Sequence, residues 1–398
     1  MSLRDAFPPR PTHAKPTSTT PSLPELVRAQ PAAASRASRP LPCYFAVPSP
    51  ALRRLLSVPA SSSSPVFREN STAARLLPAG PGRYAWEVRE GFAEASTKAL
   101  ASELFLYQQP AQLGANPSSA TELLATLTDA DSGLIVGWWP LRLAPDGRAV
   151  SLDQAPFGGP DLLSSAVPLA VVRAWIAATE GEMRARGARH CMLRLPALAY
   201  APPAIARVAE ALRLSGYRTV LAEVNNHLPF AEAYETRLHP SERRRLHKCQ
   251  RHGMRVEQEP RLLLPLAYAF MRRCREEKGQ ALSLSEAQLT ELFQRFPNNY
   301  FLFSVRDAAG EWAAMTVAVL VGNGVLYNFY PASPLHLNAF SPVVLLNAGL
   351  HAFGQASGLR LLDLGTSTLP TGLNESLLRF KRHLGGVPSL KLTLEKTL

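Results

Sequence analysis

The sequence predicts an α/β protein in which one structural unit occurs twice after a low-complexity N-terminal tail. In each half, an apolar strand, a glycine-containing hairpin turn, a second strand, a helix and a further strand follow in the same order. Gly147 and Gly324, in the two hairpin turns, lie 177 positions apart, and Gly187 and Gly358, which end the two helices, lie 171 positions apart. These similar offsets indicate a duplication, so we expect two tandem units, each a mixed twisted sheet flanked by helices.

The first 80 residues differ in composition from the rest of the chain. They contain 14 of the 35 prolines, the run SSSS at 61–64 and many Ala and Thr residues. Such a segment cannot bury enough apolar surface to offset the entropy lost on ordering. We therefore expect 1–80 to be a mostly disordered basic tail, followed by an N-terminal unit over 81–236 and a C-terminal unit over 237–398.

The net charge of +12 is concentrated in this tail, which has ten Lys or Arg residues and three acids. The remaining 318 residues carry 33 basic and 28 acidic groups, so the body of the protein is only mildly basic. The overall charge therefore gives no argument for DNA as a partner.

Cysteine usage and hydropathy indicate a cytoplasmic protein. The four cysteines, Cys43, Cys191, Cys249 and Cys274, are scattered and form no CxxC pair, which is typical of free thiols in a reducing compartment. No apolar run approaches the ~18 residues that a membrane span needs, and the N-terminus lacks an apolar signal segment. No metal-binding or phosphate-loop motif occurs, so we expect neither a metal nor a tightly bound cofactor.

The N-terminal unit is predicted to begin with a strand at 84–90 and two helices across 94–128. Its later elements are expected to be strands at 134–143 and 148–154, a helix at 161–186, a strand at 190–196, a helix at 202–214 and a strand at 217–224. The C-terminal unit is expected to contain strands at 300–306, 312–321 and 325–331, a helix at 341–356, a strand at 359–365 and a helix at 373–384.

A short basic helix is expected at 240–252, between the two units. Pro240 suits its first turn and Gly253 its C-terminal cap. Its cations cover most of the helix circumference; they are Arg243, Arg244, Arg245, Lys248 and Arg251. Two interpretations remain open: a solvated face, or a helix that binds phosphate.

Candidate functional residues gather at the predicted strand ends of the C-terminal unit, where open α/β sheets bind their ligands. Tyr327, Tyr330 and Ser333 lie at and after the end of one strand. Asp363, Thr366 and Ser367 lie on and after the next strand, Ser341 begins the central helix, and Lys381 lies two turns into the following helix. Each has an ordinary structural interpretation, but their convergence favours a site.

These motifs resemble those of the Fem-type peptidyltransferases, which are tandem-domain members of the GNAT superfamily of acyltransferases. The matching stretches are LHPSERRRLHKCQRHGM (238–254), YNFYPAS (327–333), SPVVLLNAGLHAF (341–353) and LDLGTSTLPTGLNESLLRFKRHLGG (362–386). APFGGP (155–160) is similar to the small-Gly-Gly turn of a first GNAT unit. The resemblance covers about 81–398 and implies an N-acyltransferase.

The resemblance also implies roles for individual residues. Lys381 matches the FK lysine of the family, a cation placed where negative charge collects, and Asp363 would hold the corner between strand and loop. Thr366 and Ser367 would line the acyl-transfer cleft, with Tyr327 as the third catalytic candidate. Tyr330, Ser333, Ser341, Arg243, Arg244 and Lys248 would bind substrate or donor.

The implied donor is an acyl-CoA or an aminoacyl-tRNA, and the implied acceptor is an amine, such as a cell-envelope or polysaccharide precursor. The segment 335–343 lacks the glycines with which many GNAT enzymes grip the CoA pyrophosphate, and 258–299 is too short for the helical hairpin found in many tRNA-dependent relatives. The donor therefore stays open between the two.

A competing hypothesis is a non-catalytic GNAT-fold module that binds an anionic ligand or RNA through the basic helix 240–252. The two hypotheses differ in one geometric expectation. An enzyme should bring Asp363, Tyr327 and Lys381 to one cavity, whereas a binding module need not do so.

Overall fold

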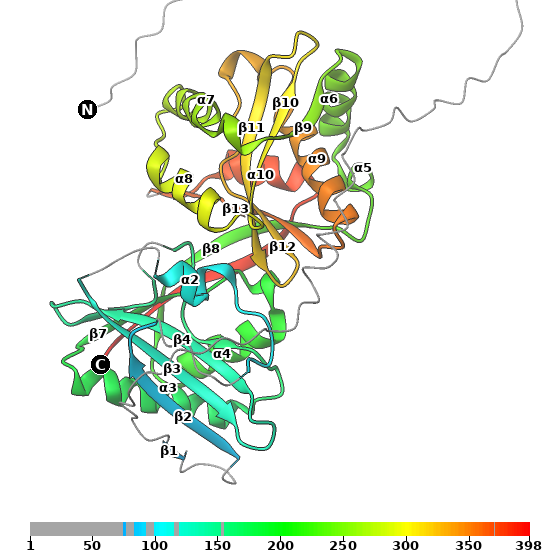
Figure 1. Cartoon of the computed structure of the whole chain (residues 1–398). Coiled ribbons are helices and arrows are strands. Elements are labelled where there is room, and N and C mark those ends of the chain that lie inside the picture. Colours follow the sequence, from blue (N-terminus) through cyan, green and yellow to red (C-terminus); the bar gives the residue numbers. More distant parts are fainter. Residues whose placement is uncertain (1–74, 77–82, 93–98, 115–118, 153–154, 370) are drawn as a thin grey trace, which may run out of the picture. The chain divides into compact units, whose positions relative to one another are not determined.

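The computed structural model describes residues 75–76, 83–92, 99–114, 119–152, 155–369 and 371–398 (Figure 1). The predicted tail, 1–80, lies outside these residues except for the two that form the first strand, and Cys43 lies outside them too. Within the described residues, one sheet of 14 strands runs through both units, in the order β1-β2-β3-β4-β5-β7-β16-β8-β13-β12-β11-β10-β9, with β6 paired to β4.

The elements of the N-terminal unit are β1 (Arg75–Leu76), β2 (Tyr84–Glu90), η1 (Leu106–Gln108), α2 (Pro110–Leu113), β3 (Thr121–Asp129), β4 (Ile135–Leu143), β5 (Arg148–Val150), β6 (Asp161–Leu162), α3 (Leu169–Ala185), β7 (His190–Arg194), η2 (Leu198–Tyr200), α4 (Pro202–Leu214) and β8 (Arg218–Pro229). Those that follow are α5 (Tyr234–Arg237), α6 (Pro240–Arg251), β9 (Arg255–Glu259), η3 (Arg261–Leu263), α7 (Leu264–Glu276), α8 (Glu286–Arg295), β10 (Tyr300–Arg306), β11 (Trp312–Gly322), β12 (Val325–Asn328), η4 (Leu335–Leu337), α9 (Pro342–Ala356), β13 (Leu361–Thr366), β14 (Thr368–Leu369), β15 (Gly372–Leu373), α10 (Glu375–His383) and β16 (Val387–Thr397).

The topology confirms the predicted tandem duplication. In the first copy β3, β4 and β5 pair antiparallel, and helix α3 then leads to β7, which pairs parallel with β5. In the second copy β10, β11 and β12 pair antiparallel, and α9 leads to β13, which pairs parallel with β12. The α/β fold class predicted from the repeat is therefore correct.

The two hairpin glycines have the same backbone conformation and hydrogen bonding in both copies. Gly147 and Gly324 both have positive φ angles, 84° and 67°, which glycine adopts without strain. Their carbonyl oxygens accept equivalent hydrogen bonds, from Arg189 N at 2.8 Å in the first copy and from Arg360 N at 2.7 Å in the second. Each hairpin is thus tied to the start of the strand that follows the crossover helix.

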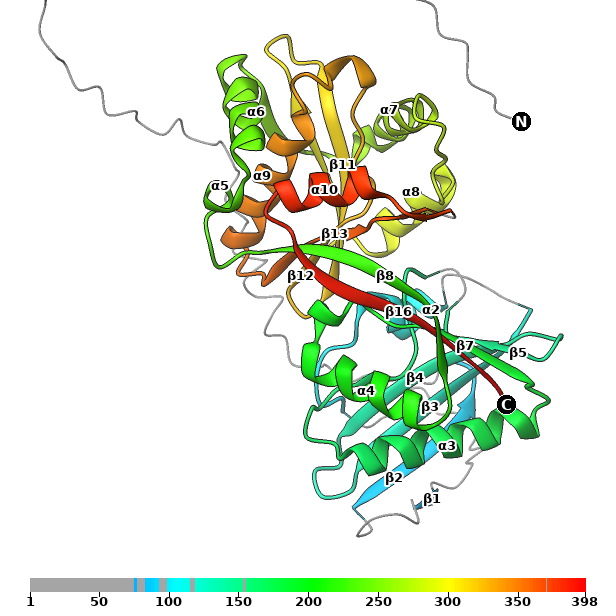
Figure 2. The same ribbon diagram turned by 180° about the vertical axis from the view of Figure 1, so that it is seen from behind.

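The two copies exchange their last strands. The chain leaves β7 through α4 into β8, yet the strand beside β7 is β16; it leaves β13 through α10 into β16, yet the strand beside β13 is β8. Strands β8 and β16 also pair with each other along almost their whole length, and Figure 2 shows them running side by side. The predicted boundary at 236/237 therefore separates segments that complete each other's sheets.

The core of the N-terminal unit lies between the sheet and helices α3 and α4. Trp139 of β4 and Trp175 of α3 are fully buried, and their rings meet edge to face with centroids 6.0 Å apart. Leu394, from the exchanged strand β16, belongs to this same core. The C-terminal unit has an apolar cluster packed around Leu346 and Leu350 of α9, and a further cluster combines residues of both units, such as Phe105 and Phe293.

Two predicted helices are wrong. The residues of 94–128 that the structure describes form η1, α2 and the start of β3 instead, because β3 is paired on both sides by β2 and β4, and this pairing outweighs its helical pattern. The predicted helix 161–186 begins only at Leu169, after β6 and the N-cap residue Pro168. The prediction also missed β9, α7, α8 and β16.

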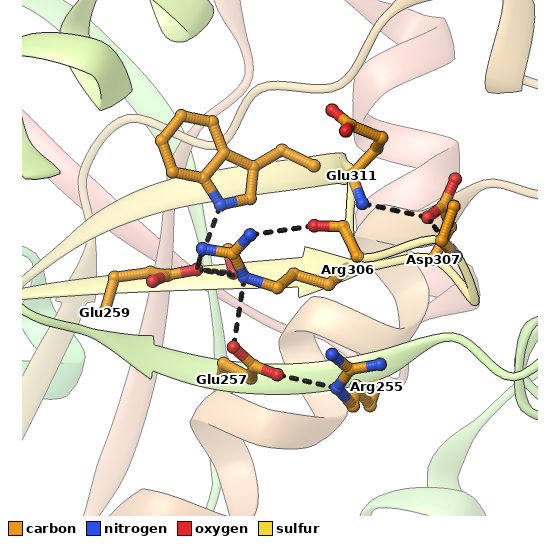
Figure 3. Close-up of polar contacts among 10 residues, drawn as sticks. Arg255, Glu257, Glu259, Arg306, Asp307 and Glu311 are labelled. Carbon is orange, nitrogen blue, oxygen red and sulfur yellow. Dashed lines mark hydrogen bonds and ion pairs between the residues drawn. The ribbon is translucent and has the colours of Figure 1, made fainter.

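A buried carboxylate joins three strands at the far edge of the sheet (Figure 3). Oε1 of Glu259, on the edge strand β9, accepts hydrogen bonds from Ser304 Oγ at 2.6 Å, Arg306 Nε at 2.8 Å and Trp312 Nε1 at 2.9 Å. These donors lower the pKa of Glu259 despite the opposing effect of burial, the largest single contribution. The network ties the edge strand β9 to β10 and β11 through side chains.

Leu394 tests the contribution of the exchanged strand. It is 2% exposed in the core of the other unit, so Leu394→Ala should lower the free energy of unfolding by about 2–5 kcal/mol. Leu390→Ala, on the same strand but 49% exposed, should change it by about 0.5 kcal/mol or less. Urea unfolding followed by tryptophan fluorescence measures both. Equal losses for the two variants would show that β16 does not support the N-terminal core.

Candidate active site

The site lies where the parallel pair β12 and β13 separates. The last paired residues are Tyr327 and Asp363, after which β13 continues to Thr366 without β12 beside it. The pairing of β13 with β8 is interrupted between Asp363 and Thr366, and Gly365 in this bulge has a φ of 74°. The bulge forms a sharp corner that carries Thr366 and Ser367.

Asp363 holds this corner through three hydrogen bonds. Its Oδ1 accepts from Asn225 Nδ2 at 2.7 Å and from Gly365 N at 2.8 Å, and its Oδ2 accepts from Tyr200 Oη at 2.5 Å. Burial and the charge of Asp363 raise the pKa of Tyr200 well above its usual value, so this hydroxyl stays protonated and donates. Because Tyr200 belongs to η2, this carboxylate links the two units.

Lys381 is fixed against the same corner by α10. The side chain of Asn374 caps this helix by accepting from Leu377 N at 3.0 Å. The Lys381 ammonium, on a side chain 7% exposed, donates to Gly365 O at 2.9 Å and to Thr366 O at 2.6 Å. Burial lowers the pKa of Lys381 to about 8, an effect that the negative charge of Asp363 opposes. An ammonium has three N–H donors, so one is left.

Two hydrogen-bond donors lie beside Gly365. A methyl carbon placed on this glycine would lie 3.7 Å from the Tyr327 hydroxyl and 4.0 Å from Lys381 Nζ. Burial, reinforced by the charge of Asp363, raises the pKa of Tyr327, so its hydroxyl also stays protonated. The absence of a side chain at Gly365 therefore leaves a small space flanked by a hydroxyl and an ammonium.

A cavity of about 700 Å³ opens beside the corner, and Tyr327 and Thr366 line it. Its walls come from both units and are aromatic or apolar at many positions, including Tyr107, Tyr300 and Phe329. Asp363 and Lys381 are not among its lining residues; they contact the backbone of the segment that carries Thr366. Of the three predicted catalytic residues, Tyr327 alone lines the cavity, so the expectation that an enzyme brings all three to one cavity is met for Tyr327 only.

Three further predicted residues lie near this corner with different surroundings. Tyr330 Oη pairs with Ser283 Oγ at 2.5 Å and accepts from Leu284 N at 3.0 Å, so it ties the segment before α8 to the end of β12. Ser333 is buried, and its carbonyl oxygen accepts from Lys278 Nζ at 2.8 Å. Ser367 is fully buried, and its Oγ has no hydrogen-bond partner among the described residues.

The predicted residues Ser341 and Lys248 meet at the N-terminus of α9, away from the cavity lining. Ser341 is the N-cap residue with a φ of 53°, and its side chain makes no capping hydrogen bond. Lys248 Nζ, on α6, lies 3.4 Å from Ala339 O and 4.1 Å from the centre of the Phe340 ring. This helix end and the cavity are therefore two distinct places on the C-terminal unit.

The basic helix α6 is less available than its sequence indicates. Arg243 donates to the carbonyl oxygens of Glu235 at 2.8 Å and Leu238 at 3.4 Å, and Arg245 forms an ion pair with Glu242 at 3.0 Å. Together with Lys248, three of the five cations thus contact their own chain. Within the described part of the chain, Arg244 and Arg251 are exposed and have no such partner.

The sequence reasoning missed several residues of this region. Tyr200 and Asn225 bind Asp363, and the cavity is lined by the charged residues Arg194, Glu223 and Lys391. The run Asn225-Asn226-His227 was a usable signal, since three consecutive polar residues inside a strand need hydrogen-bond partners.

Across the described residues no cluster of His, Cys, Asp and Glu could hold a metal, and no helix is long and apolar enough to cross a bilayer.

Tyr200→Phe tests the link between the units at Asp363. Removal of a hydroxyl that donates to a buried carboxylate should lower the free energy of unfolding by roughly 1.5–3 kcal/mol. Tyr268→Phe removes a hydrogen bond to the neutral Leu284 carbonyl, 3.0 Å away, and should cost only about 0.5–1.5 kcal/mol. Chemical denaturation compares the two. A smaller loss for Tyr200→Phe than for Tyr268→Phe would contradict the role of Tyr200.

Arg243 and Arg244 are neighbours that should respond differently to substitution. Arg243→Ala leaves two carbonyl oxygens without their donor and should lower the free energy of unfolding by about 1 kcal/mol. Arg244→Ala removes an exposed side chain and should change it by less than about 0.5 kcal/mol. Thermal unfolding of the two variants measures this difference in stability. Identical melting temperatures would show that both arginines are equally free.

The comparison with solved structures finds the same architecture elsewhere. FemX matches with a TM-score of 0.57 and 12% identity, over 74% of this chain and 92% of FemX. A tandem GNAT protein from the clavulanic acid biosynthesis pathway matches with a TM-score of 0.46 and 12% identity, over 78% and 98% of the two chains. L-PGS from Bacillus licheniformis matches with a TM-score of 0.46 and 13% identity, over 68% and 83%.

No family model matches the sequence, and a search of the curated proteins finds no match. The fold is therefore identified from the architecture and from the similarity to FemX, with which most of both chains superimposes. The protein has the fold of FemX, with one structural unit present twice in tandem.

Proposed function

We propose that the protein is an N-acyltransferase that moves an acyl or aminoacyl group from an activated donor to an amine acceptor. The observation that carries the proposal is the space at Gly365, flanked by the Tyr327 hydroxyl and the Lys381 ammonium. Acyl transfer places negative charge on the carbonyl oxygen as the amine attacks, and preorganised donors aimed at that oxygen are the largest common source of rate. The FemX fold supports the same chemistry by analogy alone.

The proposed reaction needs three contributions from this chain. Lys381 and Tyr327 would donate to the oxygen of the tetrahedral intermediate, which makes both catalytic residues. Asp363 would act as a positioning residue, because its three hydrogen bonds keep the corner in place. The neutral amine forms the new N–C bond, the donor ester or thioester bond breaks, and the amine proton leaves with the thiol or ribose hydroxyl group.

The donor is proposed to be an acyl-CoA or an aminoacyl-tRNA, both of which carry phosphate. The N-terminus of α9, with Lys248 beside it, is the proposed contact for that phosphate, because the positive end of the helix dipole and a cation both favour an anion. A thermal-shift screen of acyl-CoAs and charged tRNAs, followed by mass spectrometry of products with an amine panel, tests the function. Absence of any acylated product from either donor class would refute it.

The pH dependence of turnover tests Lys381. Because its pKa is lowered to about 8, the ammonium is present below pH 8 and is lost as the pH rises above it. Lys381→Arg keeps its charge throughout this range. With the same acceptor, the effect of acceptor deprotonation cancels in the ratio of kcat/KM between parent and Lys381→Arg. That ratio should fall as pH rises from 7 to 9.5.

Lys381→Met provides the second arm of this experiment. It removes the charge and keeps the apolar stem, so turnover at pH 7 should fall by roughly 10²–10³. Circular dichroism checks that α10 is retained. A ratio that stays flat with pH, together with turnover of Lys381→Met within about twofold of the parent, would leave Lys381 a structural contact only.

A further inference from the structure

The floor of the cavity carries a pair of opposite charges on the two exchanged strands. Glu223 of β8 and Lys391 of β16 are directly opposite each other in the antiparallel register. Both side chains are half-buried, and both line the cavity that Tyr327 and Thr366 also line. Cross-strand neighbours of this kind have Cβ atoms about 4.5–5.5 Å apart, close enough for a salt bridge.

These two charges nevertheless form no ion pair. Among the described residues, neither the Glu223 carboxylate nor the Lys391 ammonium has a hydrogen bond or a salt bridge. Burial lowers the pKa of Lys391, and the negative charges of Glu223 and Asp363 oppose this. Charges withdrawn from water without partners cost stability, so a pair left open inside a cavity points to a ligand that completes it.

The positions of the neighbouring groups indicate which of the two charges lies nearer to the corner of β13. Arg194 of β7 is opposite Thr393, two residues along β16 from Lys391, and it also lines the cavity, so two cations lie side by side. Strand β8, which carries Glu223, lies beside β13, whereas β16, which carries Lys391, lies on the far side of β8. The anion-binding end is therefore at Lys391 and Arg194, and the ammonium-binding end is nearer the corner where acyl transfer is proposed.

The rest of the cavity suits an apolar or aromatic group. Tyr107, Tyr300 and Phe329 line it, together with leucines such as Leu113 and Leu292. Its volume of about 700 Å³ falls within the range of about 300–1,000 Å³ that is usual for small-molecule sites. Two further charged lining residues are already paired, Arg142 with Glu122 and Glu291 with Arg295. A cavity with apolar walls, the Glu223 carboxylate and the neighbouring cations Lys391 and Arg194 is complementary to a zwitterion with a large side chain.

We propose that the acceptor is a free α-amino acid with an apolar or aromatic side chain, held by its ammonium at Glu223 and by its carboxylate at Lys391 and Arg194. In an α-amino acid the ammonium and carboxylate groups are attached to the same carbon atom, so both can face two opposite charges on neighbouring residues of adjacent strands. This orientation turns the amino group toward Tyr327 and Thr366. Glu223 would take up one ammonium proton, so that the neutral amine attacks and its second proton leaves with the thiol or ribose hydroxyl group. The inference rests on the proposed function, because it names the acceptor of that reaction.

Isothermal titration calorimetry at pH 7 tests the charge pair directly. The probes are L-phenylalanine, L-leucine and L-methionine, with phenethylamine and 3-phenylpropionate as analogues that keep only one of the two charges. We expect at least one amino acid to bind, and for L-phenylalanine a Kd at least tenfold lower than for either single-charge analogue. Failure of all three amino acids to bind at millimolar concentration would overturn the inference.

Two charge-removing variants assign the ends. Glu223→Gln should weaken binding of L-phenylalanine and phenethylamine at least tenfold and leave 3-phenylpropionate unchanged. Lys391→Gln should weaken L-phenylalanine and 3-phenylpropionate and leave phenethylamine unchanged. Glu311→Gln and Arg251→Gln, at exposed positions away from the cavity, are the matched controls and should change no affinity. Equal effects of either cavity variant on both analogues would contradict the assigned ends.

The same variants separate this inference from the proposed function. Acyl transfer to an amine that has no carboxylate, unaffected by Lys391→Gln, would overturn the inference and leave the function standing. Amino-acid binding with the expected charge pattern, but without product from any acyl-CoA or aminoacyl-tRNA, would instead refute the function and support the site. Acylated amino acid whose formation is lost in both cavity variants would support both.

Discussion

The exchange of β8 and β16 is the constraint on which the rest of the structure depends. Each of these strands follows the helix of one unit and completes the sheet beside the other, so neither unit has a full sheet without the second half of the chain. A linker between two independent domains would allow relative motion. A shared pair of hydrogen-bonded strands instead fixes where the two units meet, and the cavity is built at that meeting.

The corner of β13 depends on this arrangement in turn. Asp363 receives one donor from β8 and another from η2 of the first unit, while Lys381 holds the two carbonyl groups that follow. Arg360, the residue immediately before this strand, donates to the carbonyl oxygens of Ala199 and Tyr200. Because these contacts all originate outside β13, the geometry at Gly365 is set by both units together.

Local signals in the sequence were enough to predict the repeated unit but not the pairing of the exchanged strands. Hairpin glycines, helix-ending glycines and apolar strands are short-range features, and they predicted the order strand, hairpin, strand, helix, strand in both copies. Strand β16 alternates Leu390, Leu392 and Leu394 with Lys391 and Thr393, a period that indicates a strand and was overlooked. No local pattern, however, states that this strand pairs with β7, about two hundred positions away.

The candidate site shows the same division. Asp363, Tyr327 and Lys381 were found because each lies near a strand end or in a recognisable motif, and all three lie around Gly365. Glu223 and Lys391 could not be found in this way, since each is an ordinary charged residue of an alternating strand. Their significance comes only from register, which places one opposite the other inside a cavity. The helices wrongly expected across 94–128 failed for a related reason, because sheet neighbours decided the conformation.

The exchanged strand β16 also has a consequence for folding during synthesis on the ribosome. At a synthesis rate of about 5–20 residues per second, the ribosome needs on the order of 10–40 seconds to pass from β7 to β16. Throughout that interval β7 has an open edge in the nascent chain, with the apolar surface that Leu394 later covers still exposed to water. The first unit therefore cannot complete its fold while the rest of the chain is still being synthesised. A holdase chaperone that shields this edge would protect the chain until β16 emerges.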